Sequence, residues 1–291
     1  MGRDEIEVPD AWEGLVGALA SGDPGTVLVL GESDTGKSTL VRFLADRLEE
    51  EGAVWRVDGD PGQASLGPPA ALTAAPGSAE ESVALRFVGS VTPTGHFLQT
   101  LTGLARLAEL ALDEKARYVL VDLPGYSEAG GYRELLFQVG DLLRPPHLIS
   151  IQEDRELEEF LTGFEGRHGI RIHRLEPAPA VQPRSRSQRR RYREERFRQY
   201  FQDRREIELS LDAIGLHGMV PGSRRPKKWQ DLLVAPCDEE GFALALGVVR
   251  EIEPGSGFLK VEAPPFPEER IVSLQAGSLR LDPRTGEHRR S

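Results

Sequence analysis

The sequence predicts an α/β fold in which helices cover a mostly parallel sheet, followed by a small β-rich module at the C-terminus. Three observations predict it. Apolar strand-like runs alternate with helical repeats up to about residue 174. A glycine-rich segment at 31–38 joins a strand pattern to a helix pattern, and residues 206–291 consist of short strand-like runs broken by glycine and proline.

The elements follow from apolar periodicity. A lead-in helix is expected at 11–20, and a loop rich in Pro, Gly, Ala and Ser at 61–82. Strands are expected at 26–30, 53–58, 84–88, 117–122, 147–151 and 170–174, and helices at 37–50, 96–113, 131–143 and 155–164. Strands of the C-terminal module are expected at 232–234, 243–252, 258–262 and 271–274. The chain thus divides into a lead-in (1–23), a main domain (24–205) that ends in an arginine-rich helix (183–202), and the β module (206–291).

Composition excludes several classes of protein. The 291 residues contain a single cysteine, Cys237, so neither an internal disulfide nor a multi-cysteine metal site is possible. No apolar run approaches the roughly 18 residues that a membrane span needs, and the acidic N-terminus does not resemble an export signal. A cytoplasmic protein with no membrane partner is therefore expected. The net charge of -11 opposes indiscriminate coating of nucleic acid, so a polyanion has to be met locally.

Residues 31–38 read GESDTGKS, a Walker A sequence placed between a strand and a helix, as in P-loop NTPases. Successive backbone N–H groups and the helix dipole there point at one place, which suits phosphate. Lys37 is expected to reach the β- and γ-phosphates, and the Ser38 hydroxyl to bind Mg²⁺. ATP is favoured over GTP because no guanine-reading motif accompanies the other lysines. The expected nucleotide contacts are Gly31, Glu32, Ser33, Asp34, Thr35, Gly36, Lys37, Ser38 and Thr39.

Aspartates follow two of the predicted strands. Asp58 ends strand 53–58 and Asp60 lies just beyond it, at the edge where open α/β sheets place their ligands. Asp60 is the candidate base that accepts a hydroxyl proton, and Asp58 is the candidate that supports the metal shell. The alternative is that both only cap a turn. Asp122 is the last residue of strand 117–122 and is expected to organise Mg²⁺.

Gly125 and Tyr126 come three and four residues after Asp122. The Gly125 N–H is expected to approach the γ-phosphate. Tyr126 either stacks on a nucleobase or packs under the next loop.

An arginine-dense segment, 184–198, holds eight arginines and two glutamates. Arg186, Arg190 and Arg193 have helical spacing that continues into Phe197 and Phe201, which suggests a lid whose guanidinium groups meet a transferring phosphoryl group. A solvated basic helix or a nonspecific RNA patch is the alternative.

Thr92 and His96 lie beyond strand 84–88, where substrate contact is one expectation and helix capping by the Thr/Gly stretch is the other. The remaining histidines have no ligand spacing, so no zinc is expected.

Five segments together resemble the polynucleotide 5′-hydroxyl kinase family, which includes the RNA kinase subunit of the pre-mRNA cleavage complex and the ribosomal-RNA-processing 5′-kinases. They are GESDTGKS, VDGDPGQ, FVGSVTPTGH, VDLPGY and RSRSQRRRYREERFRQYF. The resemblance covers most of residues 25–202, and it is closest to the short prokaryotic form, which lacks a preceding β-sandwich.

The resemblance implies Mg²⁺-dependent transfer of the γ-phosphate of ATP to the 5′-OH of RNA or DNA. It implies roles for Lys37 and Ser38, for Asp58, Asp60 and Gln63, and for Arg186, Arg190 and Arg193. The role that the resemblance implies for Gln63 is contact with the substrate. One departure stands out: the family's Thr-x-Gly-Trp clasp reads Leu123-Pro124-Gly125-Tyr126 here. Two alternatives remain, a nucleotide-binding scaffold of RNA processing with little or no kinase activity, and a kinase of nucleosides.

Overall fold

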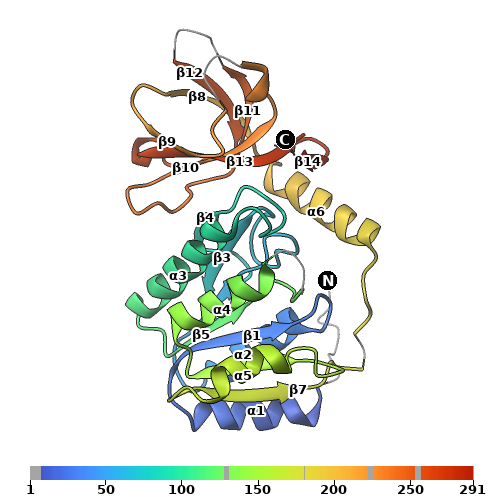
Figure 1. Ribbon diagram of the computed structural model, residues 1–291. Helices are drawn as coiled ribbons and strands as arrows, with labels where there is room; N and C mark the ends of the chain where they lie inside the picture. Colours follow the sequence, from blue (N-terminus) through green and yellow to red (C-terminus); the bar gives the residue numbers. More distant parts are fainter. Residues whose placement is uncertain (1–7, 128–130, 180, 222–225, 253–256, 291) are drawn as a thin grey trace. The chain divides into compact units, whose positions relative to one another are not determined.

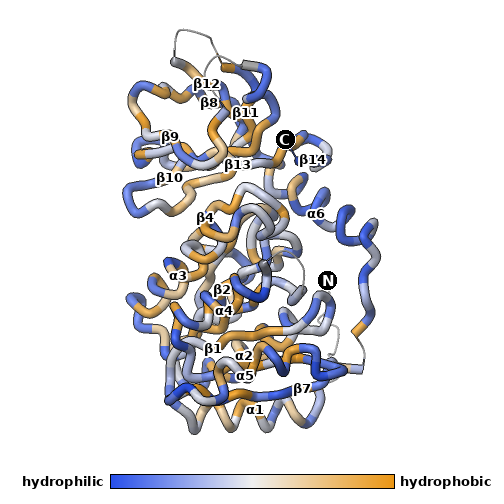
Figure 2. The backbone as a smooth tube through the Cα atoms, in the orientation of Figure 1, coloured by the Kyte–Doolittle hydropathy of each residue, from blue (hydrophilic) through white to orange (hydrophobic). Residues whose placement is uncertain are grey.

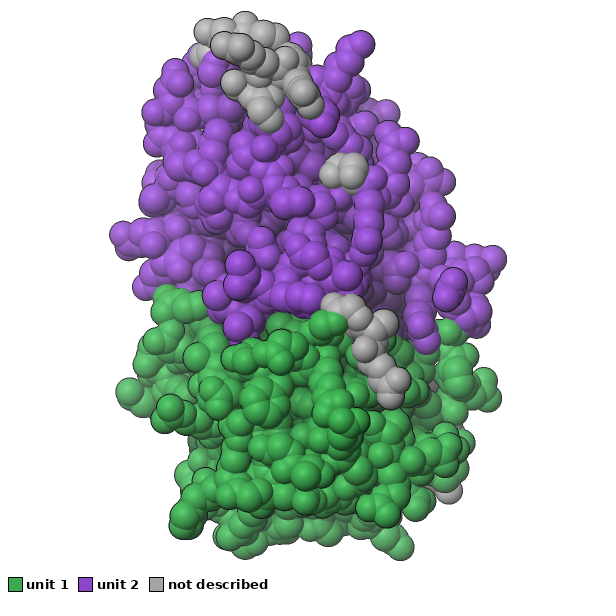
Figure 3. Space-filling view, viewed as in Figure 1, with its two compact units in different colours: residues 1–59, 74–81, 104–184 green, residues 60–73, 82–103, 185–291 purple. Residues whose placement is uncertain are grey.

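The computed structural model describes residues 8–127, 131–179, 181–221, 226–252 and 257–290 (Figure 1). The chain forms two compact units, each built from separate segments (Figure 3). Unit 1 comprises residues 1–59, 74–81 and 104–184, and unit 2 comprises 60–73, 82–103 and 185–291. The chain therefore passes from unit 1 to unit 2 directly after Gly59. The contiguous boundaries expected at 23/24 and 205/206 stay a prediction.

Five parallel strands form the sheet of unit 1. Their bounds are β1 (Gly25–Gly31), β2 (Val54–Asp58), β5 (Tyr118–Asp122), β6 (His147–Ile151) and β7 (Arg171–Leu175). The order is β2-β5-β1-β6-β7, with every adjacent pair parallel. The register aligns Asp58 with Asp122, so the last residues of β2 and β5 are neighbours beside β1. The predicted parallel α/β fold is confirmed, and all five strands lie within one residue of their expected ends.

Strands β3 (Ala71–Pro76) and β4 (Ala84–Phe87) extend the order to β4-β3-β2-β5-β1-β6-β7. The chain passes from unit 2 to unit 1 within β3, after Thr73. The expectation of a loop throughout 61–82 is therefore wrong. The segment ALTAAP has the small residues of a loop, yet all but its last residue is buried. Packing rather than intrinsic β-propensity determines this strand.

The helices that accompany the sheet are α1 (Asp10–Ala20), α2 (Lys37–Leu48), α3 (Phe97–Asp113), α4 (Tyr132–Leu143) and α5 (Glu158–Glu165). Leu40, Leu44 and Leu48 of α2 recur every four residues and pack in one buried cluster with β1 and with Trp12 of α1. Helix α5 begins at Glu158, three residues later than the expected start at 155. Within the described residues, no helix combines the length and apolar character needed to cross a bilayer.

Unit 2 contains an arginine-rich helix and a mostly antiparallel sheet. Its elements are α6 (Arg186–Tyr200), β8 (Arg205–Ser210), β9 (Gly215–Gly218), the 3₁₀ turns η1 (Pro226–Lys228) and η2 (Glu268–Arg270), β10 (Leu232–Cys237), β11 (Gly247–Ile252), β12 (Phe258–Ala263), β13 (Ser273–Leu281) and β14 (His288–Arg290). The order is β14-β13-β10-β11-β12-β8, and β9 pairs parallel with β13. Figure 2 shows the contrast between polar α6 and apolar β1.

The predicted β module is confirmed, but three of its strands, β8, β9 and β14, were not predicted. Strand β8 reads REIELS, and only Ile207 and Leu209 are buried. Two apolar positions among charges are too few to indicate a strand by alternation. The strand expected at 243–252 begins only at Gly247, and the one expected at 271–274 continues to Leu281.

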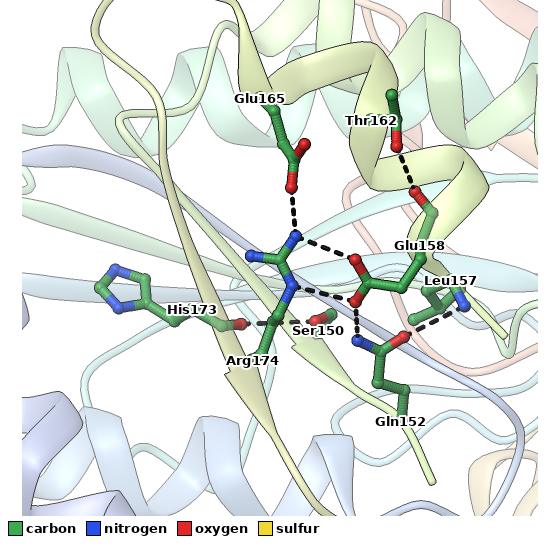
Figure 4. A network of polar contacts seen from close by, with 8 residues as sticks. All are labelled: Ser150, Gln152, Leu157, Glu158, Thr162, Glu165, His173 and Arg174. Carbon is green, nitrogen blue, oxygen red and sulfur yellow. Dashed lines mark hydrogen bonds and ion pairs between the residues drawn. The ribbon is translucent and has the colours of Figure 1, made fainter. Parts of the chain in front are cut away.

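A polar network joins β6, α5 and β7 at the edge of the unit 1 sheet (Figure 4). Arg174 on β7 forks onto both carboxylate oxygens of Glu158, at 2.9 and 3.0 Å, and also pairs with Glu165. Gln152 donates to Glu158 and accepts from the Leu157 N–H, 3.1 Å away. The hydrogen bonds from Arg174 and then Gln152 hold the pKa of Glu158 below its usual value. The bidentate geometry fixes the edge strand to the helix that covers it.

Two histidines form a second link between β6 and β7. Nδ1 of buried His147 lies 3.0 Å from Nε2 of His173, and Nε2 of His147 lies 3.1 Å from the Asp23 carbonyl oxygen. The carbonyl can only accept, so His147 carries its proton on Nε2 and accepts from His173 through Nδ1. Burial, and then the neighbouring His147, lower the pKa of His173 to about 4.

Acidification is therefore expected to destabilise unit 1 through this pair. Between pH of about 6.5 and about 4 the unfolded chain binds protons that the folded pair excludes, so the free energy of unfolding falls as pH falls. The loss should be on the order of 1 to 2 kcal/mol, which allows for screening of a partly buried ring. His173→Gln keeps a donor to His147 without titrating, so urea unfolding followed by circular dichroism should give a flatter acid limb. An unchanged limb would contradict the assignment.

Candidate active site

The Walker A segment forms a tight loop between β1 and α2. Gly36 adopts a φ of 95° directly before α2, and its carbonyl accepts the N–H groups of Thr39 and Leu40. Lys37 is only 7% exposed, and its ammonium donates to the carbonyl oxygens of Gly31 (3.0 Å) and Glu32 (2.6 Å). The cation is thus held inside the loop, at a helix N-terminus that favours phosphate. The loop residues predicted to contact nucleotide, 31–39, all lie on this one turn and the start of the helix.

Ser38 and two aspartates meet at the carboxyl ends of β1, β2 and β5. The Ser38 hydroxyl donates to a carboxylate oxygen of Asp122, and the Gly59 N–H donates to the Asp122 carbonyl, 2.8 Å away. Asp58 and Asp122 are register partners, both about 4% exposed or less. A hydroxyl beside two carboxylates is a hard oxygen donor set, which Mg²⁺ prefers. These residues fit the predicted metal roles of Ser38, Asp58 and Asp122.

Gly125 lies directly against the Walker A loop. A Cβ atom at this position would be 2.9 Å from the Ser33 backbone nitrogen and 3.0 Å from its Cα. The next residue, Tyr126, donates its N–H to the Gly31 carbonyl at 2.9 Å. The Tyr126 side chain is only 8% exposed, which favours the packing alternative over nucleobase stacking.

Gly125→Ala is expected to weaken ATP binding about tenfold, because the added methyl group overpacks against the loop backbone by roughly 1 to 3 kcal/mol. Isothermal titration calorimetry would measure the dissociation constant. Gly17→Ala, at an exposed position of α1, is the matched control, since nothing lies within 4 Å of its added Cβ atom. Equal affinities for the two variants would remove Gly125 from the nucleotide site.

Asp60, the first residue of unit 2 after β2, adopts the turn geometry that sequence analysis left as an alternative. Its Oδ1 accepts the N–H groups of Gly62 (2.8 Å) and Gln63 (3.2 Å). The carboxylate is thereby oriented by the backbone. Capping a turn through one oxygen does not preclude proton transfer through the other, so the base role of Asp60 stays a prediction.

Helix α6 begins with a capping box. The Ser185 hydroxyl accepts the Gln188 N–H, and the Gln188 side chain accepts the Ser185 N–H. At the other end Phe197 and Phe201 are fully buried in unit 2. The capping box thus fixes where the helix begins, and the two buried phenylalanines anchor its other end in unit 2.

One face of α6 lies along the segment that follows Asp60. The Tyr192 hydroxyl donates to the Ala64 carbonyl at 2.9 Å, and Arg196 donates to the Gly67 carbonyl at 2.7 Å. Arg193 lies between them in sequence. Burial lowers the pKa of its guanidinium, and the charge of Asp60 acts in the opposite direction. Asp60 and Arg193 are therefore within electrostatic reach of each other inside unit 2.

Of the predicted arginine stripe, Arg193 alone is half-buried. Arg186 and Arg190 are exposed, and Arg190 pairs with Glu194 at 2.7 Å. Arg189 and Arg196, which were not predicted, share the half-buried face with Arg193 at the same helical spacing. Helical spacing of arginines is visible in the sequence, but several different sets of arginines in this segment have that spacing.

Thr92 and His96 occupy the loop between β4 and α3. The loop is close to the Asp60 turn, because a Cβ atom on Gly62 would be 2.6 Å from the Val91 carbonyl oxygen. His96 is 4% exposed, and its Nε2 lies 2.7 Å from the Ser278 hydroxyl. Burial, together with the charge of Arg290, lowers its pKa. His96 thus links the loop after β4 to β13 through Ser278. Substrate contact by Thr92 and His96 stays a prediction.

The predicted site residues therefore form two sets. Unit 1 brings together the Walker A loop, Asp58, Asp122, Gly125 and Tyr126. Unit 2 brings together Asp60, Gln63, Thr92 and Arg193. The first set has the chemistry of a nucleotide and metal site, and the second has an oriented carboxylate and a guanidinium.

Comparison with known proteins identifies the family. Residues 31–203 match the P-loop domain of the mRNA cleavage and polyadenylation factor CLP1. The chain belongs to the CLP1 P-loop family. Relatives of this family member include a polyribonucleotide 5′-hydroxyl-kinase of Pyrococcus furiosus, 26% identical over 89% of this chain and 88% of the relative. A second, of Methanocaldococcus jannaschii, is 25% identical over 95% of this chain and 92% of the relative.

Solved structures support the same fold for this CLP1-family chain. A chain of a wild-type Clp1p–Pcf11p complex superposes with a TM-score of 0.68 at 17% identity, covering 92% of this chain and 78% of the other. At that identity the likeness establishes the architecture. It extends beyond the P-loop domain, over most of this chain.

Proposed function

We propose that this protein is a polynucleotide 5′-hydroxyl kinase that transfers the γ-phosphate of ATP to the 5′-OH of RNA or DNA. The observation that carries the proposal is the Ser38–Asp122 hydrogen bond, which lies in the same strand-to-helix turn as the buried Lys37 ammonium. This arrangement supports a phosphate and metal site. The names of archaeal relatives that align over nearly the whole chain support the acceptor class.

The nucleotide roles are proposed for the Walker A loop and the aspartates at the strand ends. The N–H groups of the Walker A loop and the Lys37 ammonium would hold the β- and γ-phosphates. Ser38, Asp122 and Asp58 would hold Mg²⁺, which neutralises phosphate oxygens when bound. Gly125 lets the chain pass close to the loop without a side chain in between.

The acceptor roles are proposed for Asp60 and Arg193. Asp60 would take the proton of the 5′-hydroxyl while the hydroxyl oxygen attacks the γ-phosphorus. A new oxygen–phosphorus bond forms, the bond to the β–γ bridging oxygen breaks, and ADP leaves. Arg193 would offer its guanidinium to charge that builds up on the transferred group. Orientation of Asp60 by two backbone N–H groups reduces the reorganisation that proton transfer requires.

A scaffold that binds ATP without transferring phosphate is the second candidate. The replacement of a clasp threonine by Leu123, and the burial of Tyr126, favour it. Leu123 has no hydroxyl to offer a phosphate, and Tyr126 is too covered to stack on a base.

One experiment separates these functions. The protein is incubated with γ-labelled ATP, Mg²⁺ and one acceptor: a 5′-OH oligoribonucleotide, its DNA counterpart, or a nucleoside. Label at the 5′ end of an oligonucleotide, lost with Lys37→Ala, is expected. Label on the nucleoside alone would overturn the proposal in favour of a small-molecule kinase. ATP binding without label on any acceptor would overturn it in favour of the scaffold.

A further inference from the structure

Half of the residues that line a pocket in unit 2 are arginines. The pocket has a volume of about 490 Å³ and forms around the end of β13, the following turn and β14, with contributions from α6, β11 and the start of β10. The guanidinium groups come from Arg190, Arg250, Arg280, Arg284 and Arg289. In a chain with a net charge of -11, this is a local reversal of sign. The size is within the roughly 300 to 1,000 Å³ of ordinary ligand sites.

Two of these arginines form hydrogen bonds or ion pairs with other parts of unit 2. Arg250 donates to Asp231 (2.8 Å) and Glu262 (2.9 Å), which accounts for one lining carboxylate. Arg280 donates to the carbonyl oxygens of Lys228 (2.7 Å) and Gln230. They form the frame of the pocket.

The pocket is lined by five arginines and three carboxylates, so its lining has a net positive charge. Asp282 accepts the backbone N–H of Arg284 at 2.8 Å, within the β13–β14 turn. The charge of Glu287 acts on Arg190, whose nearest partner is Glu194. Within the described ranges, the exposed guanidiniums of Arg284 and Arg289 have neither an ion pair nor a side-chain hydrogen bond.

The strand register adds a repulsion. Arg280 and Arg289 are direct cross-strand partners on β13 and β14. Like charges placed opposite each other destabilise a strand pair. An anion bound between the two guanidinium groups would relieve that repulsion.

The lining also specifies the kind of anion. The one ring among the residues that line the pocket is His288, which packs in a T-shaped contact against Phe197 at a centroid distance of 5.6 Å. Leu281 is buried. Arginines suit phosphate because their fork matches its oxygens, and phosphate contacts carry no base sequence.

We propose that this pocket binds phosphodiester groups of the polynucleotide substrate. The inference rests on the proposed function for the identity of the polyanion. A 5′-OH end carries no phosphate of its own, so the groups bound here belong to later nucleotides. The pocket raises affinity for long strands, without sequence preference and with strong dependence on salt.

The test is direct binding, because binding does not depend on catalysis. Fluorescence anisotropy follows a long, 3′-labelled single strand that is already 5′-phosphorylated, and so cannot accept phosphate. Arg284→Ala/Arg289→Ala is compared with Arg205→Ala/Arg270→Ala, which removes two exposed arginines of the same unit that pair with Glu268 and Asp238 outside the pocket. Thermal unfolding checks that both variants fold.

The pocket variant is expected to bind about tenfold more weakly at low salt. Its slope of log affinity against log salt should fall by about 1.4, because each phosphate contact on a single strand contributes about 0.7. The control should keep the wild-type slope, and two strands of different sequence should give equal losses.

Three results would overturn the inference. One is wild-type affinity and slope in the pocket variant, and another is an equal loss in the control. The third is a second ATP site, found by calorimetry and lost in the pocket variant, which would assign the pocket to a free nucleotide. A lack of phosphoryl transfer alone leaves this binding result standing, so the two proposals fail separately.

Discussion

Lys37→Met is expected to lower kcat for phosphoryl transfer by about 100- to 1,000-fold. Methionine keeps an unbranched stem in a position that is only 7% exposed, so the packing around the Walker A loop survives while the ammonium is lost. The ammonium now lies against two carbonyl oxygens, where phosphate oxygens can compete for it. Steady-state kinetics with a 5′-OH oligonucleotide and saturating ATP would measure the change.

The matched control for Lys37→Met is Lys115→Asn. Lys115 is exposed and has a φ of 64°, a conformation that asparagine tolerates. The Lys115→Asn substitution removes one ammonium group from the same unit but outside the nucleotide site. The rate of this variant should therefore equal that of the wild type. A Lys37→Met enzyme with the rate of the control would show that the cation takes no part in the transfer.

Asp60→Asn is also expected to have a large effect, a fall in kcat of about 100- to 10,000-fold. The asparagine Oδ1 can still accept the N–H groups of Gly62 and Gln63, so the turn is preserved. Only the capacity to take a proton is lost. KM for the oligonucleotide should change little, because the shape of the site is retained.

Asp60→Ala separates the two roles of this residue. It removes the turn cap as well as the base, so it should cost stability in addition to activity. If Asp60→Asn turned over at the wild-type rate while Asp60→Ala did not, the carboxylate would be a turn cap alone and another group would accept the proton.

The nucleotide side of the site could be predicted from the sequence because its signals are local. A glycine-rich octapeptide between a strand and a helix has few structural solutions. Asp58 and Asp122 each end an apolar strand, and parallel strands bring such ends together. The register that makes them direct partners, however, depends on pairing between strands about 60 residues apart, which periodicity does not encode.

The acceptor side was less predictable. Helical spacing places Arg186, Arg190 and Arg193 on one face of α6, but where the helix meets the rest of unit 2 decides which of them is covered. The contacts of Tyr192 and Arg196 with the segment after Asp60 are tertiary, so Arg193 is half-buried while its two companions stay in solvent. Strand β3 was missed for a similar reason, since burial rather than β-branched side chains defines it.

The pair of enclosed carboxylates at the ends of β2 and β5 has a consequence for how ligands load. A bare triphosphate entering beside Asp58 and Asp122 meets repulsion, and a divalent ion arriving first meets attraction. ATP and Mg²⁺ should therefore bind cooperatively, and by thermodynamic reciprocity each tightens the other by the same factor.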